Sequence, residues 1–138
     1  MNYTLHDFQK RWCRRTFEAF RTGIEGRPLT KVLATAATGA GKTVMASALI
    51  YATVRSLKKR TLFLADTDDL VDQGATGIFK ASGLIASIEQ ATNQGNRSSM
   101  NVVGSIQSIS QPARLASWPA DHFGLVIADE AHLSMADS

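Results

Sequence analysis

The stretch Ala36-Ala37-Thr38-Gly39-Ala40-Gly41-Lys42-Thr43 decides how this sequence is expected to fold. A short apolar run, residues 32–36, leads into it and has a length that suits a buried strand. Apolar residues then recur at helical spacing over residues 44–52. A strand, a glycine-containing loop and a helix that begins at Lys42 therefore follow one another directly. This order makes the loop a candidate binding site for phosphate groups.

The loop has the residue types that a bound polyphosphate requires. Gly39 and Gly41 lack a Cβ, so backbone N–H groups can turn toward an anion at the positive end of the helix. Lys42 can reach the β- and γ-phosphates of a nucleotide, and the Thr43 hydroxyl can ligate Mg²⁺. The alternative is a chance match in a turn, which the flanking strand and helix disfavour. The predicted nucleotide-binding residues here are Thr38, Gly39, Ala40, Gly41, Lys42 and Thr43.

Length and composition are those of one globular domain. The chain has 138 residues, of which 44% are hydrophobic and 20% are charged. No apolar run approaches the ~20 residues of a membrane span, and the first residues lack the pattern of a signal peptide. Cys13 is the only cysteine, which excludes an internal disulfide and favours a reducing compartment. We therefore expect a cytoplasmic protein with no membrane contact.

Charge is distributed unevenly along the chain. Residues 1–60 hold twelve Lys and Arg against three acidic residues, a net charge of +9. Residues 61–138 hold three Lys and Arg against nine acidic residues, a net charge of −6. The basic half could bind nucleic acid, or it could simply form the solvated face of an amphipathic helix. The sequence leaves both interpretations open.

The rest of the chain alternates between helices and strands that are apolar almost throughout. Such strands are typical of a parallel sheet covered on both faces, with ligands beyond the carboxyl ends of the strands. Besides the helix that begins at Lys42, we predict helices at residues 4–21, 67–79 and 111–116. Predicted strands cover residues 32–36, 60–65, 83–89, 101–104 and 123–128, and residues 90–100 are predicted to form an exposed loop.

An acidic pair, Asp129 and Glu130, follows the last of these predicted strands. Unpaired carboxylates beside a core are costly, so the pair is expected to serve a cation or a reaction. Asp129 can hold Mg²⁺ through water opposite Thr43, and Glu130 can polarise the water that attacks a γ-phosphate. An ordinary exit of a strand into a solvated loop is the alternative, and the phosphate-binding loop makes it the weaker one.

These motifs resemble, in content and order, the N-terminal RecA-like domain of superfamily 2 helicases of the DEAD/DEAH-box type. The nearest branch is that of the type I and type III restriction translocases, and the resemblance extends from Phe8 to His132. It implies an α/β fold of the RecA-like P-loop NTPase class, a three-layer sandwich with a mostly parallel sheet. It also implies ATP and Mg²⁺ as cofactors and a nucleic-acid partner, with DNA favoured over RNA. Residues 129–132 match motif II of the family, whose histidine, here His132, couples nucleotide state to a second domain.

Further residues obtain roles from this resemblance. Residues 5–9 resemble a segment whose glutamine reads the adenine base, which implies that role for Gln9. Residues 62–73 resemble motif Ia, which touches the nucleic-acid backbone and contains Thr67. This loop also holds three aspartates, at positions 66, 68 and 69, where the family often has a basic residue. Residues 102–108 resemble the T-x-Q motif with Ser105 in the place of the threonine, so Ser105 and Gln107 are implied nucleic-acid contacts.

Motors of this family use a second RecA-like domain that supplies arginines across the ATP cleft. The chain ends six residues after His132, so we expect residues 1–138 to be a partial first domain that hydrolyses ATP slowly alone. A P-loop kinase or GTPase is disfavoured, because no guanine-reading Asn-Lys-x-Asp string occurs and because Gln9 and Gln107 fit the motor. A non-catalytic nucleotide-binding fragment or interaction module derived from such a motor remains open.

Overall fold

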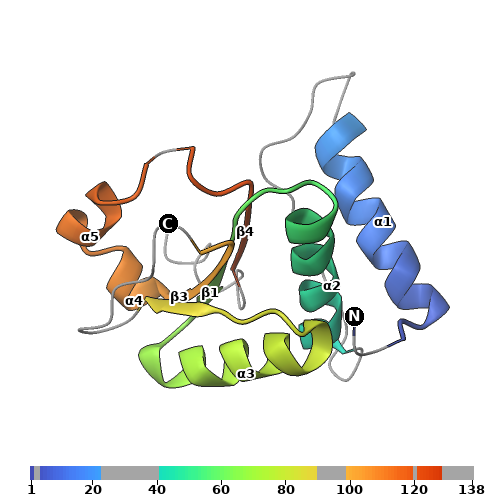
Figure 1. Cartoon of the computed structure of the whole chain (residues 1–138), viewed down its shortest axis with the longest axis horizontal. Helices are drawn as coiled ribbons and strands as arrows, with labels where there is room; N and C mark the ends of the chain where they lie inside the picture. The colour runs from blue at the N-terminus through green and yellow to red at the C-terminus, as the bar shows by residue number, and fades with distance from the viewer. Residues whose placement is uncertain (2–3, 23–40, 90–98, 120, 129–138) are drawn as a thin grey trace.

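The computed structural model describes residues 1, 4–22, 41–89, 99–119 and 121–128 of the chain. The described residues form helices and the strands of one sheet, as Figure 1 shows. The strands are β1 (Thr61–Ala65), β2 (Ser87–Glu89), β3 (Asn101–Ser105) and β4 (Leu125–Ala128). The helices are α1 (Asp7–Thr22), α2 (Lys42–Arg55), α3 (Val71–Ser82), α4 (Ile106–Ile109) and α5 (Pro112–Ala116), with a 3₁₀ turn, η1 (Asp68–Leu70), before α3.

The four described strands form a parallel sheet in the order β2-β3-β1-β4. β1 lies between β3 and β4, and Phe63 is in register with Val103 on one side and Ile127 on the other. Parallel strands need crossover connections, and here α3 lies between β1 and β2 in the chain. The predicted α/β class with a parallel sheet is confirmed.

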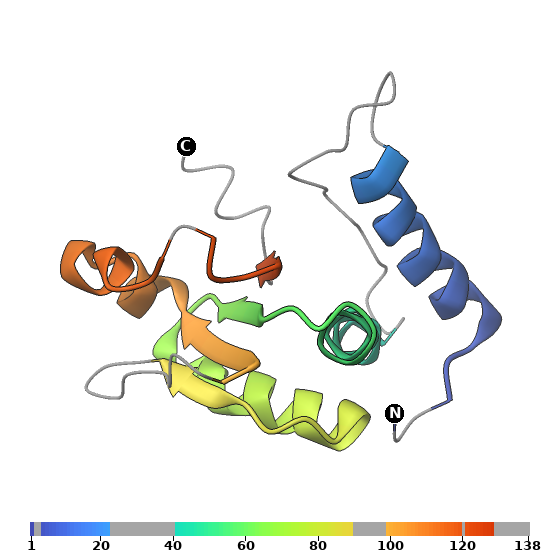
Figure 2. The same cartoon turned by 45° about the horizontal axis from the view of Figure 1, so that its top comes forward.

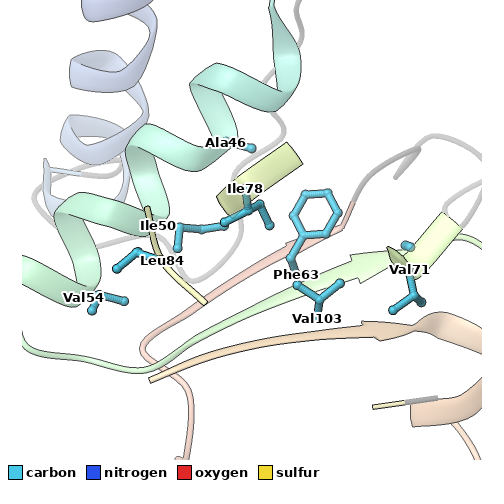
Figure 3. Close-up of a cluster of buried hydrophobic side chains, with 9 residues drawn as sticks. Ala46, Ile50, Val54, Phe63, Val71, Ile78, Leu84 and Val103 are labelled. Atoms are coloured by element: carbon cyan, nitrogen blue, oxygen red, sulfur yellow. The ribbon is translucent and has the colours of Figure 1, made fainter. Parts of the chain in front are cut away.

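Both faces of the sheet are covered, as predicted from the apolar strands. On one face, α2 and α3 pack against Phe63 and Val103, with Ile50 and Ile78 fully buried between them (Figure 3). On the other face, Leu62 and the neighbouring strand's apolar side chains pack against α4 and Trp118. Alternate residues of β1 thus enter different cores, as the period of a strand requires.

Helix α1 lies on the outer side of α2, away from the sheet (Figure 2). It begins at Asp7, three residues later than predicted, because the side chain of Gln9 turns back to the start of the helix. There its Oε1 accepts a hydrogen bond of 2.9 Å from the backbone N–H of His6, which satisfies a donor that the helix leaves free.

The predicted strands at 60–65, 101–104 and 123–128 correspond to β1, β3 and β4, whereas the prediction for 83–89 was too long. β2 covers only its last three residues, because Gly83 ends α3 in a left-handed conformation with φ 78° and Ile85 is 79% exposed. The short helix α4 was not predicted. The predicted strand at 32–36 lies outside the described residues, as does most of the predicted loop at 90–100. Within the described residues, no helix has the length and apolar character needed to cross a membrane.

Candidate nucleotide-binding site

The first feature of the site is the N-terminus of α2, which follows Gly41 directly. Gly41 precedes the helix with φ 78° and ψ 47°, a left-handed conformation that glycine adopts without steric cost. The first helical hydrogen bond joins the N–H of Met45 to the carbonyl of Gly41 at 2.9 Å. Gly41 is the N-cap residue and has no side chain with which to cap this end. The backbone N–H groups of Lys42, Thr43 and Val44 therefore face outward without a helical acceptor, which is what an anion site needs.

Lys42 and Thr43 are exposed, as expected of residues that meet a ligand in solution. The residues that follow them are buried: Met45 is 1% exposed and Leu49 is 4% exposed. The hydroxyl of Ser47 donates to the carbonyl of Thr43 at 2.6 Å and fixes the first turn. The helix is thus anchored by its apolar side and leaves the cation and the hydroxyl of its first turn accessible.

Gln9 lies against the end of the same loop. It is 5% exposed, and a Cβ added to Gly41 would come within 2.7 Å of Gln9 Nε2. The hydrogen bond from His6 to Gln9 Oε1 holds the side chain in this position. The structure therefore brings Gln9 to the start of α2, although 32 residues separate Gln9 and Gly41. Contact of Gln9 with an adenine base stays a prediction.

Cys13 fastens α1 to α2 one turn further along. Its thiol donates to the carbonyl of Met45, with Sγ 3.7 Å from the oxygen. Burial raises the pKa of Cys13 to about 11, because the thiolate would lose its hydration. The thiol stays protonated at neutral pH and is a structural group there rather than a nucleophile.

Thr43 also has a close neighbour on α3 that the sequence did not suggest. A Cβ added to Gly77 would lie 2.7 Å from Thr43 Cγ2, so a larger residue at position 77 would require the Thr43 side chain to move. The glycine backbone of α3 therefore borders the methyl group of the predicted Mg²⁺ ligand. No local pattern signals this contact, because it depends on how α2 and α3 pack.

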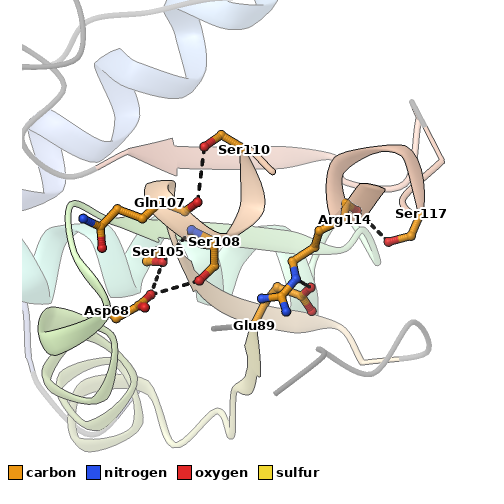
Figure 4. A network of polar contacts seen from close by, with 8 residues as sticks. All are labelled: Asp68, Glu89, Ser105, Gln107, Ser108, Ser110, Arg114 and Ser117. Atoms are coloured by element: carbon orange, nitrogen blue, oxygen red, sulfur yellow. Dashed lines mark hydrogen bonds and ion pairs between the residues drawn. The ribbon is translucent and has the colours of Figure 1, made fainter. Parts of the chain in front are cut away.

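A second group of predicted residues lies at the carboxyl ends of β1 and β3. Asp68 Oδ1 accepts hydrogen bonds from the hydroxyls of Ser105 and Ser108, the latter at 3.0 Å (Figure 4). Ser105 Oγ in turn accepts the N–H of Ser108 at 3.0 Å and caps α4. The two loops are thereby tied together, although 37 residues separate Asp68 from Ser105.

The hydrogen bonds between Asp68, Ser105 and Ser108 determine which side chains of the two loops are accessible to a nucleic acid. Asp68 points inward, toward the hydroxyl of Ser108, so its charge is not presented to a nucleic acid. Asp69 is exposed and can present its charge. Ser105 is fully buried, so any influence on a bound strand passes through Asp68 and the start of α4. Gln107 is exposed and Thr67 is half-buried. The sequence analysis missed the role of Asp68. A serine before a short helix is a capping signal, so the cap that Ser105 forms on α4 could have been predicted.

A comparison with protein families gives a match over almost the whole chain. The family model described as "Type III restriction enzyme, res subunit" matches residues 2–138. The chain belongs to this family. The matched region is the N-terminal ATPase domain of superfamily 2 helicases and translocases. No curated protein matches the chain.

Membership in the res subunit family bears out the resemblance and the fold class, and the four-stranded parallel sheet agrees with a RecA-like domain. Several predicted residues of this res-type domain lie outside the described part: Thr38, Gly39, Ala40, Asp129, Glu130 and His132. Strand β4 ends at Ala128, which is in register next to Leu64 at the carboxyl end of β1. Asp129 is the next residue in the chain.

Proposed function

We propose that this res-type domain binds ATP together with Mg²⁺ and hydrolyses it as the first motor domain of a DNA helicase or translocase. The observation that supports this most strongly is the N-terminus of α2 behind a left-handed Gly41, which has no side chain to cap it, with Lys42 and Thr43 both exposed. An N-terminus of this kind provides N–H donors, a partial positive charge and a lysine at one place, and phosphate groups need all three. Family membership supports ATP as the source of these phosphate groups.

Each residue has a separate part in the proposed reaction. Lys42 neutralises charge on the β- and γ-phosphates, and Thr43 with Asp129, the latter through water, would hold Mg²⁺. A metal ion held there would supply positive charge to offset the negative charge that develops on the phosphates during transfer. Glu130 orients and polarises the attacking water. Gln9, fixed beside Gly41, is the proposed contact for the adenine base.

The proposed partner of the motor is DNA, and Thr67 and Gln107 are the proposed contacts at the ends of β1 and β3. His132 is proposed to transmit the nucleotide state to a second RecA-like domain. Arginines from that domain would complete the charge stabilisation of the transition state, which is why rapid turnover is expected only when both domains are present. A nucleotide-binding module without turnover is the competing function.

Binding of ATP can be tested by calorimetric titration with and without Mg²⁺. The wild-type chain should bind ATP more tightly with Mg²⁺ than with a chelator. Thr43→Ala should lose this metal-dependent gain, because the alanine has no ligand oxygen. Thr76→Ala is the matched control, since Thr76 is an exposed threonine on α3. An affinity of the wild type that does not respond to Mg²⁺ would contradict the proposed metal site.

Turnover is a separate test, best made on a protein in which the proposed second RecA-like domain is present. Phosphate release should rise when duplex DNA is added, and single-stranded DNA and RNA show which track the motor prefers. Glu130→Gln should retain ATP binding and lose turnover, since the amide cannot polarise the water. ATP binding without turnover on any nucleic acid would refute the hydrolytic part of the proposal and leave the nucleotide-binding module.

A further inference from the structure

The outward side of α1 carries a row of cations. We define the α1 basic face as Lys10, Arg11, Arg14, Arg15 and Arg21, all of which are exposed. At 3.6 residues per turn, these five positions lie within about 140° of the helix circumference and along about 16 Å of its axis. Asp7 and Glu18 are the acidic residues on the same side. The central turns, from Lys10 to Arg15, contain no acidic residue.

The opposite side of α1 holds the helix in place, so this face has a fixed direction. Gln9 is 5% exposed and Thr16 is 8% exposed. The Cys13 thiol donates a hydrogen bond to the carbonyl of Met45 on α2. Figures 1 and 2 show α2 between α1 and the sheet, with α4 at the far end of the molecule. The α1 basic face is therefore a different surface from the one that contains Thr67 and Gln107.

The cations of this face have no internal partner in the described residues. None of the five makes an ion pair or a hydrogen bond through its side chain there, whereas Arg114 is paired with Glu89 at 3.3 Å. Lys10 with Arg14, and Arg11 with Arg15, are like charges four residues apart, an arrangement that weakens a helix. Asp7 and Glu18 lie three or four residues from cations of this face and offset part of its charge. Five cations against two acidic residues still leave this side of α1 with a net charge of +3, which an external polyanion can neutralise.

We propose that the α1 basic face binds the phosphate backbone of duplex DNA, as a second contact that does not depend on nucleotide. Three of the four central cations are arginines, whose planar guanidinium matches two phosphate oxygens. A duplex presents one phosphate charge per about 1.7 Å of its axis, so a row of about 16 Å can meet several of them. Contacts of this type fix the protein on its track without reading sequence. The choice of DNA as the polyanion rests on the proposed function.

The test measures binding of the wild-type chain and of two variants to a short fluorescein-labelled DNA duplex by anisotropy, between about 50 and 200 mM NaCl. Glutamine replaces the cations because its helix propensity is similar to that of Lys and Arg. The α1 variant combines Lys10→Gln, Arg11→Gln, Arg14→Gln and Arg15→Gln. The control removes the same number of exposed charges elsewhere and combines Arg55→Gln, Lys58→Gln, Lys59→Gln and Lys80→Gln.

Each lost phosphate contact reduces the slope of log K against log salt by about 0.9, or about 3.6 for four contacts. Over that salt range, such a slope corresponds to about 100-fold in affinity. The α1 variant should lose this slope, and the control should keep most of it. An equal loss in both variants would mean a general effect of net charge and would overturn the proposal, as would wild-type binding that is absent at low salt.

Two readouts separate this inference from the proposed ATP site and from misfolding. ATP affinity should be the same in the wild type and the α1 variant, because Lys42 and Thr43 are untouched. The thermal midpoint should change little, because the variant removes two like-charge pairs and also the attraction of Asp7 and Glu18 for cations three or four residues away. If the fourfold variant does not fold, the pairs Lys10→Gln with Arg14→Gln and Arg11→Gln with Arg15→Gln should each lose about half of the slope change. Retention of the full slope in both pairs would overturn the proposal even if ATP binding is confirmed.

Discussion

Replacing Gly41 by alanine should destabilise the junction of α1 and α2 by about 2–3 kcal/mol. Two effects contribute. An L-residue at φ 78° costs about 1–2 kcal/mol, because its Cβ approaches the following carbonyl. The new Cβ would also lie 2.7 Å from Gln9 Nε2 and force that buried side chain to move. Its hydrogen bond with the N–H of His6 is then lost, at about 1 kcal/mol.

A double-mutant cycle with Gln9→Ala separates these two effects. In the Gln9→Ala background, Gly41→Ala should cost only the backbone term, so the two positions should show a coupling of about 1 kcal/mol. In the wild-type background, the thermal midpoint should fall by about 10 °C, since 1 kcal/mol corresponds to roughly 4 °C in a domain of this size. Gly83→Ala is the matched control, because Gly83 has the same φ at an exposed position. Equal costs of Gly41→Ala in both backgrounds would refute the contact between Gln9 and Gly41.

Three further substitutions should change the stability of the domain. Asp68→Ala removes the carboxylate that accepts hydrogen bonds from the Ser105 and Ser108 hydroxyls, and the buried Ser105 hydroxyl loses its acceptor. The free energy of unfolding, measured by chemical denaturation, should therefore fall by about 1–3 kcal/mol. An unchanged free energy of unfolding would argue against the network. Gly104→Ala would place a Cβ 2.9 Å from the backbone oxygen of Glu89 and should cost about 1–3 kcal/mol in the same assay; a neutral effect would contradict the close packing of β2 and β3. The pKa of Cys13 is raised by burial from 9.0 to about 11, so its contribution to stability is complete below pH 9 and is lost as the pH rises toward 11. Melting curves of the wild type and Cys13→Ala should accordingly converge over this pH range, and parallel curves would contradict the shift.

The strands with the most apolar sequences could be predicted because both of their faces are buried. β1 and β3 contribute Phe63 and Val103 to one core and other residues to the opposite core, so they read as continuous apolar runs. The prediction failed before β2, where Ile85 is apolar but 79% exposed. Apolar character alone does not show whether a residue is buried. Helix α3 ends here because Gly83 adopts a left-handed conformation.

The candidate site was predictable where it is local in sequence. Gly41, Lys42 and Thr43 are consecutive, and a loop followed by a helix determines how they are presented. The tie of Asp68 to the start of α4 and the approach of Gly77 to Thr43 depend instead on which elements lie side by side in space. Such lateral contacts leave no periodic signal in the sequence.

The proposed function depends on contact between Lys42 and the phosphates of ATP at the N-terminus of α2. The most direct measurement is the affinity of a fluorescent ATP analogue with Mg²⁺ for the wild type, Lys42→Ala and Lys10→Ala. Lys10 is an exposed lysine on α1 and serves as the control for the loss of one positive charge. Lys42→Ala should abolish binding while its circular dichroism spectrum and thermal midpoint stay those of the wild type, because the exposed side chain contributes nothing to the core. Unchanged affinity in a folded Lys42→Ala chain would contradict the assignment of this loop as the phosphate-binding site.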